Sequence, residues 1–206
     1  MTFVLASNNE KKLIELREIL SDLGLEVISQ RQAGLRLEVE ETGTTFEENA
    51  FLKAKGACDA LGLPAIADDS GLEVAALGGA PGVFSARYGA ENGVELSSAE
   101  RNALLLRNTA KAEDRRARFV SAIACVFPDG TVLRARGEVY GELLRAPRGD
   151  GGFGYDPIFW LPELGKSMAE LDPEEKNAIS HRGRALREFR QKLIALREDG
   201  RGGKVE

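Results

Sequence analysis

The segment from Ala65 to Val74 constrains the fold of this chain more than any other part of its sequence. A short apolar run there ends in two adjacent aspartates, Asp68 and Asp69, which are followed by Ser70 and Gly71. This order predicts a buried strand that delivers two carboxylates to a loop at its end. Adjacent buried carboxylates repel each other and are costly to desolvate, so they are tolerated where a cation or a reacting group lies between them. Asp-Asp-Ser-Gly is also favourable turn chemistry, so this segment alone leaves a metal or catalytic site and an ordinary turn both open.

Length, charge and cysteine content exclude several classes of protein. The chain has 206 residues, 43% of them hydrophobic, which suits one large domain or two fused lobes with a sizeable core. A net charge of -5 argues against broad binding of nucleic acid, and the lack of an 18-residue apolar run predicts no membrane span. The first residues lack the charged and apolar regions of a secretory signal. We expect a cytoplasmic protein with Cys58 and Cys125 as reduced core residues.

Hydrophobic periodicity predicts alternating strands and helices. Residues 2–6 and 26–28 read as strands, and the helix between them buries Leu13, Leu16, Leu20 and Leu23 and stops at Gly24. Capping boxes at Thr45/Glu48 and Ser97/Glu100 begin two further helices, and a last helix carries Leu186, Phe189, Leu193 and Leu196. Residues 119–127 and 131–140 flank a Pro-Asp-Gly turn and predict a β-hairpin. The fold is therefore expected to be α/β with a mixed sheet, in two lobes with a cleft between them.

A first candidate site lies between the first predicted strand and the first predicted helix. It comprises Ser7, Asn8, Asn9, Glu10, Lys11 and Lys12. Free backbone N–H groups and the helix dipole favour an anion there, and Lys12 adds a full positive charge. The segment is not a Walker loop, because it lacks the glycines and the Gly-Lys-Ser/Thr ending. Ordinary capping of the helix by Ser or Asn explains the same residues.

A second candidate combines a carboxylate pair with a lysine. Glu40 and Glu41 directly precede the second helix, and Glu41 either complements the helix dipole or joins Asp69 around a metal. Lys53 lies near Ala50 and Ala54 in a region predicted to be packed. Its ammonium either reaches solvent or meets a buried anion.

Two later segments suggest recognition of a flat ligand. Glycines around Phe153 in the segment 151–156 allow a planar group to approach the backbone and stack on the ring, although a tight connection with Phe153 in the core is the alternative. His181, the only histidine, stands beside Arg182 where the last helix begins. Protonation there would add positive charge near Arg182 and the helix dipole, so His181 suits neutral hydrogen bonding to carbonyl oxygens and ring nitrogens.

Together these segments resemble the inosine/xanthosine triphosphate pyrophosphatase family, which clears deaminated purine nucleotides. The resemblance is carried in order by Ser7-x-Asn9-x-x-Lys12, Glu40-Glu-Thr-Gly43, Phe46-x-Glu48-Asn49-Ala50, Ala67-Asp-Asp-Ser-Gly71, Gly79-Ala-Pro-Gly-Val-Phe-Ser-Ala-Arg-Tyr88, Gly151-Gly-Phe-Gly-Tyr-Asp-Pro-Ile-Phe159 and Ser180-His-Arg182. Single motifs are weak, but seven in sequence are hard to obtain by chance. The resemblance covers residues 2 to about 197, which implies one two-lobed domain over residues 1–197 and a flexible tail over residues 198–206.

The resemblance implies an elongated mixed β-sheet with flanking helices, two lobes around a central cleft, and a homodimer. It also implies hydrolysis of ITP, dITP and XTP to the monophosphate and pyrophosphate with Mg²⁺. Asp69 would be the water-activating base and a metal ligand, Glu40 a second ligand, and Ser70 a substrate contact. Ser7 to Lys12 would hold the phosphates. Phe153, Gly154, Tyr155, Asp156, Lys176, His181 and Arg182 would hold the base.

Elementary electrostatics agrees with these roles. A triphosphate is strongly anionic and the protein is itself acidic, so binding requires a local positive field from Lys12, Lys53, Mg²⁺ and a helix N-terminus. Two other functions compete with this interpretation. A Maf-like pyrophosphatase would take pyrimidine or modified nucleotides, which the Phe153 loop and the His181-Arg182 pair disfavour. A non-enzymatic nucleotide sensor would not need the intact set of Glu40, Asp68 and Asp69.

Overall fold

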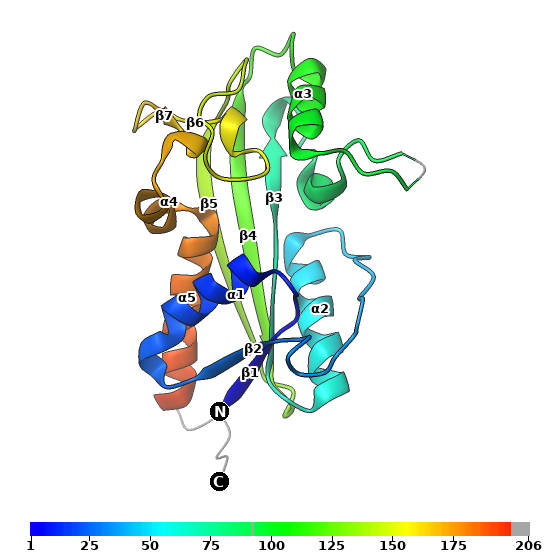
Figure 1. Cartoon of the computed structure of the whole chain (residues 1–206), viewed down its shortest axis with the longest axis vertical. Coiled ribbons are helices and arrows are strands. Elements are labelled where there is room, and N and C mark those ends of the chain that lie inside the picture. The colour runs from blue at the N-terminus through cyan, green and yellow to red at the C-terminus, as the bar shows by residue number, and fades with distance from the viewer. Residues whose placement is uncertain (92, 199–206) are drawn as a thin grey trace. The chain divides into compact units, whose positions relative to one another are not determined.

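The computed structural model describes residues 1–91 and 93–198. These residues form one sheet of seven strands with helices beside it (Figure 1). The strand order is β2-β1-β3-β4-β5-β6-β7. The strands are β1 (Thr2–Leu5), β2 (Glu26–Ser29), β3 (Ala65–Val74), β4 (Arg116–Val126), β5 (Val132–Leu143), β6 (Phe159–Leu161) and β7 (Lys166–Ser167). The helices are α1 (Glu10–Leu20), α2 (Phe46–Leu61), α3 (Ser98–Asn108), α4 (Pro173–Ile179) and α5 (His181–Glu198).

The sheet is mixed, as predicted. β1 pairs in parallel with both β2 and β3, with Val4 opposite Ala65, whereas β6 pairs antiparallel with both β5 and β7. β4 and β5 are neighbours joined by the predicted turn, in which the Gly130 N–H donates to the Phe127 carbonyl. The α/β class and the mixed sheet with flanking helices are therefore confirmed. The cleft between two lobes stays a prediction.

Within the described residues the chain forms two compact units. The first comprises residues 1–69, 121–137 and 184–198, and the second comprises residues 70–120 and 138–183. In the first unit α1 and α5 share one core with the sheet, which includes Leu13 and Leu16 of α1 and Phe189 and Leu193 of α5. Val4, Ala65 and Ala67 are also buried but point to the other side of their strands, because successive strand residues alternate. α2 packs against β1 and buries its alanine face.

The second unit has its own apolar core. It gathers Leu72, Phe119, Val139, Phe159 and Met168 from four strands and a short helical turn. The rings of Phe119 and Phe159 lie 4.4 Å apart between centroids, tilted by 37°. Aromatic pairs in this range add to the stabilisation that comes from area burial alone. Each unit thus buries enough apolar surface to fix the backbone of the segments that carry polar residues.

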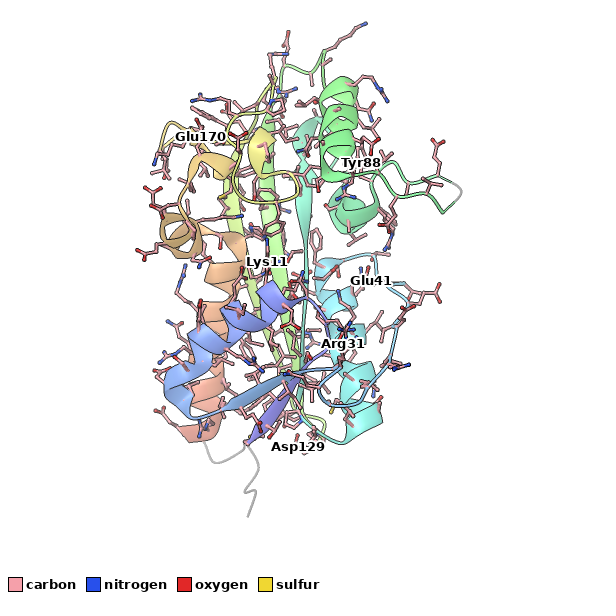
Figure 2. All side chains as sticks on the ribbon, in the orientation of Figure 1. Lys11, Arg31, Glu41, Tyr88, Asp129 and Glu170 are labelled. Carbon is pink, nitrogen blue, oxygen red and sulfur yellow. The ribbon has the colours of Figure 1, made fainter. Side chains whose placement is uncertain are left out.

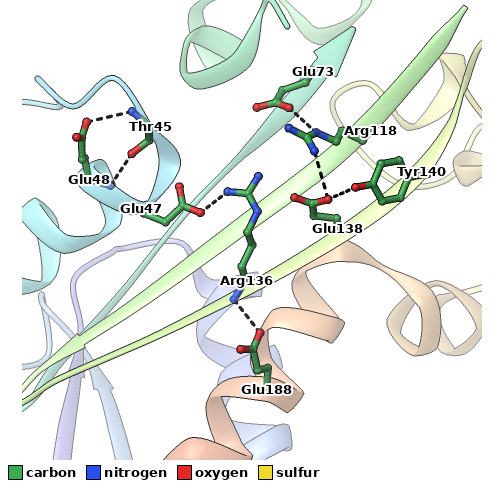
Figure 3. A network of polar contacts seen from close by, with 9 residues as sticks. All are labelled: Thr45, Glu47, Glu48, Glu73, Arg118, Arg136, Glu138, Tyr140 and Glu188. Carbon is green, nitrogen blue, oxygen red and sulfur yellow. Dashed lines mark hydrogen bonds and ion pairs between the residues drawn. The ribbon is translucent and has the colours of Figure 1, made fainter. Parts of the chain in front are cut away.

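Charged side chains link neighbouring elements within each unit, as Figure 3 shows. In the first unit, the backbone N–H of Arg136 in β5 donates to Glu188 of α5 at 3.0 Å, and its guanidinium pairs with Glu47 of α2. In the second unit, Arg118 of β4 lies between Glu73 of β3 and Glu138 of β5. Opposite charges on adjacent strands stabilise the pairing of those strands.

Helix boundaries follow the capping residues that the sequence displays. Thr45 and Glu48 form a reciprocal capping box at α2 (Figure 3). Ser97 and Glu100 do the same at α3. Gly24 and Gly62 end their segments in the left-handed conformation that glycine adopts without strain. Cys58 and Cys125 are free and buried, as predicted.

Two predictions about local structure were wrong or incomplete. β3 does not end at Asp68 and Asp69 but continues to Val74, so both aspartates lie within the strand. Helix α4 was not among the predicted elements, although Asp172 and Glu175 form a capping box around Pro173, which suits a first helical position. Glu198 is the last residue of α5, and the predicted tail beyond it lies outside the described residues. No described helix has the length and apolar character that a membrane crossing needs.

Candidate functional site

The adjacent aspartates of β3 have separate lysine partners. Asp68 is 9% exposed, and its carboxylate lies 2.8 Å from the Lys12 Nζ of α1. Asp69 lies 3.0 Å from the Lys53 Nζ of α2. Because successive side chains point to opposite faces of a strand, each aspartate meets a different helix. The mutual repulsion that the sequence implied is therefore relieved by two cations, one for each carboxylate.

Asp69 belongs to a cluster that the loop before α2 completes. The Lys53 Nζ also donates to Glu41 at 2.8 Å, so one ammonium joins two carboxylates. The Nδ2 of Asn49, on the same helix, donates to the second oxygen of Asp69 at 3.4 Å. We name Glu41, Asn49, Lys53 and Asp69 the Asp69 cluster. All four residues belong to the first unit.

The environment changes the protonation equilibria of both charged partners. Burial raises the pKa of Asp69, and the attraction of Lys53 together with hydrogen bonds offsets this only in part. Burial would lower the pKa of Lys53, but attraction by Asp69 and Glu41 outweighs it and raises that pKa above the ordinary value. Lys53 therefore stays protonated at neutral pH. Asp69 is a stronger base than an ordinary aspartate, which suits a group that takes a proton from water.

The segment from Ser7 to Lys12 caps α1 with its own side chains. The Oδ1 of Asn9 accepts from the backbone N–H groups of Lys11 at 3.0 Å and Lys12 at 3.3 Å, and the Ser7 hydroxyl accepts from the Asn9 N–H at 3.1 Å. The structure thus provides the ordinary cap that was the alternative to an anion site. Asn8, Glu10 and Lys11 are exposed, and Figure 2 places Lys11 on α1. Lys12, through Asp68, is the member of this segment that reaches the acidic part of β3.

The two glutamates before α2 are placed differently. Glu41 is half-buried against Lys53, on the segment that leads into α2 in Figure 2, whereas Glu40 is exposed. The described residues contain no group of three or more His, Cys, Asp or Glu side chains arranged to hold a metal. The assignment of Glu40 and Asp69 as metal ligands stays a prediction. Ser70 follows directly in β3 and is half-buried.

In the second unit, Asp156 organises the glycine-rich segment. Its Oδ2 accepts from the backbone N–H of Phe153 at 2.7 Å and from the Lys176 Nζ at 2.6 Å. A side chain at Gly152 would place its Cβ 2.3 Å from that same oxygen, so the glycine is required for the carboxylate to approach the backbone. α4, which the sequence analysis missed, is the element that brings Lys176 to Asp156.

Phe153 is not a core residue. The residue is 49% exposed, which excludes the alternative that the glycines only make a tight connection around a buried phenylalanine. The Lys176 Nζ lies 4.4 Å and the Arg182 Cζ 5.7 Å from the ring centroid. Both distances are within the range of cation–π attraction. An exposed ring beside two cations suits a flat, electron-rich ligand.

His181 and Arg182 occupy the first turn of α5. The imidazole of His181 stacks on Phe119 with centroids 4.8 Å apart and planes 16° apart. The Ser180 hydroxyl accepts from the Gly183 N–H at 3.0 Å and so caps the helix. Both His181 and Arg182 are buried, so their ring and guanidinium are held by packing rather than by solvent. Their role in recognising a nucleotide base stays a prediction.

Tyr155 and Gly154 have structural partners inside the second unit. The Tyr155 hydroxyl donates to the Ser85 carbonyl at 2.7 Å, and burial raises the pKa of Tyr155 to about 12. Its ring is part of the core, so any contact with a ligand would come from its backbone. The Nδ2 of Asn102 in α3 donates to the Gly154 carbonyl at 3.0 Å and anchors the loop that carries Phe153.

Sequence reasoning missed three of these polar residues as site members. The sequence leaves Glu41 open beside Glu40, contains Asn49 only as part of a family motif with no assigned role, and gives no indication of Asn102. Asn49 had a signal, because it stands four residues before Lys53 and so shares its helix face. Asn102 had none, since its contact with Gly154 spans 52 positions.

These features define an α/β protein with a carboxylate–lysine cluster in one unit and an exposed aromatic ring beside two cations in the other. The chain belongs to the Ham1 family, whose model matches residues 3–192. It is 51% identical over 189 residues to a dITP/XTP pyrophosphatase of Thermus thermophilus, covering 91% of this chain and 89% of the relative. It is 52% identical over 192 residues to a dITP/XTP pyrophosphatase of Aromatoleum aromaticum, covering 92% and 95%.

Solved structures agree with this assignment. A HAM1 protein from Coxiella burnetii superimposes with a TM-score of 0.87 at 47% identity, covering 96% of this chain and 99% of that one. A structure described as nucleoside-triphosphatase / dITP/XTP pyrophosphatase from Mycobacterium abscessus gives a TM-score of 0.77 at 43% identity, covering 95% and 98%. The family resemblance inferred from the motifs is confirmed.

Proposed function

We propose that this chain is a nucleoside triphosphate pyrophosphatase that hydrolyses dITP, XTP and ITP to the monophosphate and pyrophosphate. The observation that carries the proposal is the identity of about half with relatives named dITP/XTP pyrophosphatase over nearly the whole of both chains. The Asp69 cluster supports it, because hydrolysis needs a basic carboxylate where a purely binding protein does not.

In the proposed reaction, Asp69 accepts a proton from a water molecule as the water oxygen forms a bond to phosphorus. The bond that breaks joins the α and β phosphates, and pyrophosphate leaves with its electron pair. Lys53 stays protonated and stabilises Asp69 as a carboxylate between turnovers. A positioned base of this kind contributes about 10²–10⁴-fold to the rate.

Mg²⁺ is part of the proposal. Burial raises the pKa of Asp69, and the positive charge of a cation nearby would instead favour its ionised, metal-binding form. Mg²⁺ is typically bound by one or two carboxylates together with substrate phosphates, and Asp69 and Glu40 would supply those carboxylates. When bound, the ion neutralises and polarises the phosphoryl oxygens. Lys12 would add positive charge for the same phosphates.

Recognition of the base is assigned to the second unit. Phe153 would stack on the purine, while Arg182 and His181 would hydrogen-bond the carbonyl oxygen at ring position 6. Adenine shows an amino group at that position, so a donor such as Arg182 would face another donor. Each buried group left unsatisfied costs about 1–3 kcal/mol, which corresponds to roughly 5- to 150-fold discrimination. We further propose that the enzyme is a homodimer and that it works in the cytoplasm. Light scattering of the purified protein tests whether it is a dimer.

The test is a panel of dITP, XTP, ITP, ATP, GTP, dTTP and UTP with Mg²⁺ and separate detection of pyrophosphate and orthophosphate. We expect pyrophosphate from the first three, at rates well above the rates on ATP and GTP. Orthophosphate as the first product, or equal rates on ATP, would contradict the proposal. A preference for dTTP or UTP would favour a Maf-like activity, and tight binding of ITP without turnover would favour a sensor.

A further inference from the structure

Two consecutive turns of α2 hold the two oxygens of the Asp69 carboxylate. The Lys53 Nζ donates to Oδ1 at 3.0 Å, and the Asn49 Nδ2 donates to Oδ2 at 3.4 Å. Asn49 and Lys53 are four residues apart and therefore lie on the same face of the helix. Asn49 is fully buried. Each carboxylate oxygen thus has its own donor from one rigid element.

The other end of the Asn49 amide is fixed by backbone. Its Oδ1 accepts from the Gly43 N–H at 2.8 Å. A backbone N–H can only donate, so the amide oxygen must face Gly43 and the amide NH₂ group must face Asp69. The loop before α2 therefore sets which way Asn49 presents its donor.

Gly43 allows this arrangement because it has no side chain. A Cβ there would lie 2.6 Å from the Asn49 Oδ1 and 2.7 Å from the Glu48 Cβ, both too close for real contacts. The loop consequently reaches Asp69 by two parallel routes. One runs from Glu41 through Lys53 and is charged; the other runs from Gly43 through Asn49 and is neutral.

We propose that Asn49 is a positioning residue for Asp69, which fixes the rotation of its carboxylate so that the basic lone pair faces the reacting water. The terminal torsion of an aspartate is broad, so a single donor on one oxygen leaves the carboxylate free to turn. A second donor on the other oxygen removes that freedom. The hydrogen bond from Asn49 to Asp69 is long at 3.4 Å, so it contributes more to the orientation of the carboxylate than to the stability of the protein. This inference rests on the proposed function, in which Asp69 takes the proton from water.

The first test separates positioning from binding in the kinetics. Asn49→Asp keeps an oxygen for Gly43 and has almost the same shape, but it loses the donor to Asp69. We expect kcat on dITP to fall about 10- to 100-fold with KM within about two-fold of the parent value. Asn108→Asp adds the same charge at an exposed position of α3 and should change neither constant. An unchanged kcat, or an equal loss in the control, would overturn the proposal.

A second variant, Gly43→Ala, tests the same contact in case the Asn49→Asp protein does not fold. Gly43→Ala changes no polar group, but its methyl displaces the Asn49 amide. We expect the same pattern of reduced kcat and retained KM. A Gly43→Ala protein with normal melting temperature and full kcat would count against Asn49 as the positioning residue.

The third measurement does not depend on activity. The side-chain NH₂ signal of Asn49 is assigned in the NMR spectrum by its loss in the Asn49→Asp variant. We expect Asp69→Ala to move that signal and Asp59→Ala, an exposed change on the same helix, to leave it in place. If dITP and XTP are not substrates, the proposed function fails while this result still tests the contact. If the chemical shift of the Asn49 NH₂ group is the same in the Asp69→Ala protein as in the parent, Asn49 does not position Asp69.

Discussion

Replacement of Lys53 by methionine tests whether one buried ammonium stabilises the two carboxylates beside it. Lys53 is 17% exposed and lies 2.8 Å from Glu41 and 3.0 Å from Asp69, whose side chains are 25% and 13% exposed. Methionine has a similar length and no charge, so Lys53→Met keeps the packing and leaves two unneutralised carboxylates. Breaking a buried pair from one side costs about 3–5 kcal/mol. We take about 3 kcal/mol, because both carboxylates keep some contact with water.

The matched control lies two residues further along α2. Lys55 pairs with Asp59, but these side chains are 51% and 60% exposed, so Lys55→Met should cost less than about 1 kcal/mol. For a protein of this size, about 3 kcal/mol corresponds to a fall of roughly 6–12 °C in melting temperature. Thermal and urea unfolding of the three proteins at pH 7.5 measures the difference.

The pH dependence gives the sharper version of this test. Asp69 already has a raised pKa, and removal of Lys53 raises it further, so the folded variant binds a proton more tightly than the unfolded chain does. When a carboxyl group has a higher pKa in the folded protein than in the unfolded chain, the folded protein becomes less stable as the pH rises above the unfolded pKa, which is 3.8 for an aspartate. The deficit of Lys53→Met should therefore shrink as the pH falls from 7.5 toward 4. A deficit equal to that of Lys55→Met, or one that stays constant with pH, would refute the reasoning.

Three further predictions address the same two units. Asp69→Asn should abolish pyrophosphate release while circular dichroism stays unchanged, and Asp59→Asn, an exposed change of the same type, should keep full activity. Phe153→Leu should raise KM for dITP with a smaller effect on kcat, whereas Phe84→Leu should not; Phe84 is also exposed and also lies beside an arginine, so the pair isolates the stacking site. Tyr155→Phe leaves a buried carbonyl without its donor and should lower the free energy of unfolding by about 1–3 kcal/mol at pH 7. Burial raises the pKa of Tyr155 from its ordinary value of 10.0 to about 12 in the folded protein, so the parent protein should become less stable as the pH rises through that interval. Tyr155→Phe has no phenol to ionise and should lack this loss.

The sequence by itself determined the local structure where a few neighbouring residues decide it. The capping boxes at Thr45 and Ser97 and the buried Leu13, Leu16 and Leu20 of α1 appear as predicted. The predicted stop at Gly24 closes a 3-10 turn after α1, which itself ends at Leu20, and Leu23 in that turn is only partly buried. A helix cap or a buried stripe depends on residues within one or two turns, so a short window contains the information. The same kind of local signal marks the start of α4, where Asp172, Pro173 and Glu175 form a capping box, although that helix was not predicted.

Only the tertiary structure decided what the polar residues do with one another. The sequence predicts Asp68 and Asp69 at the end of a strand and leaves a cation, a reacting group or an ordinary turn open there. In the structure β3 runs past them, and each aspartate meets a lysine from a different helix. Glu41, not Glu40, lies against Lys53. These pairings join positions 12 to 56 residues apart. The order of residues along a strand does not say which helix will cover each face, because that depends on how the strands pair and how the helices pack on the finished sheet.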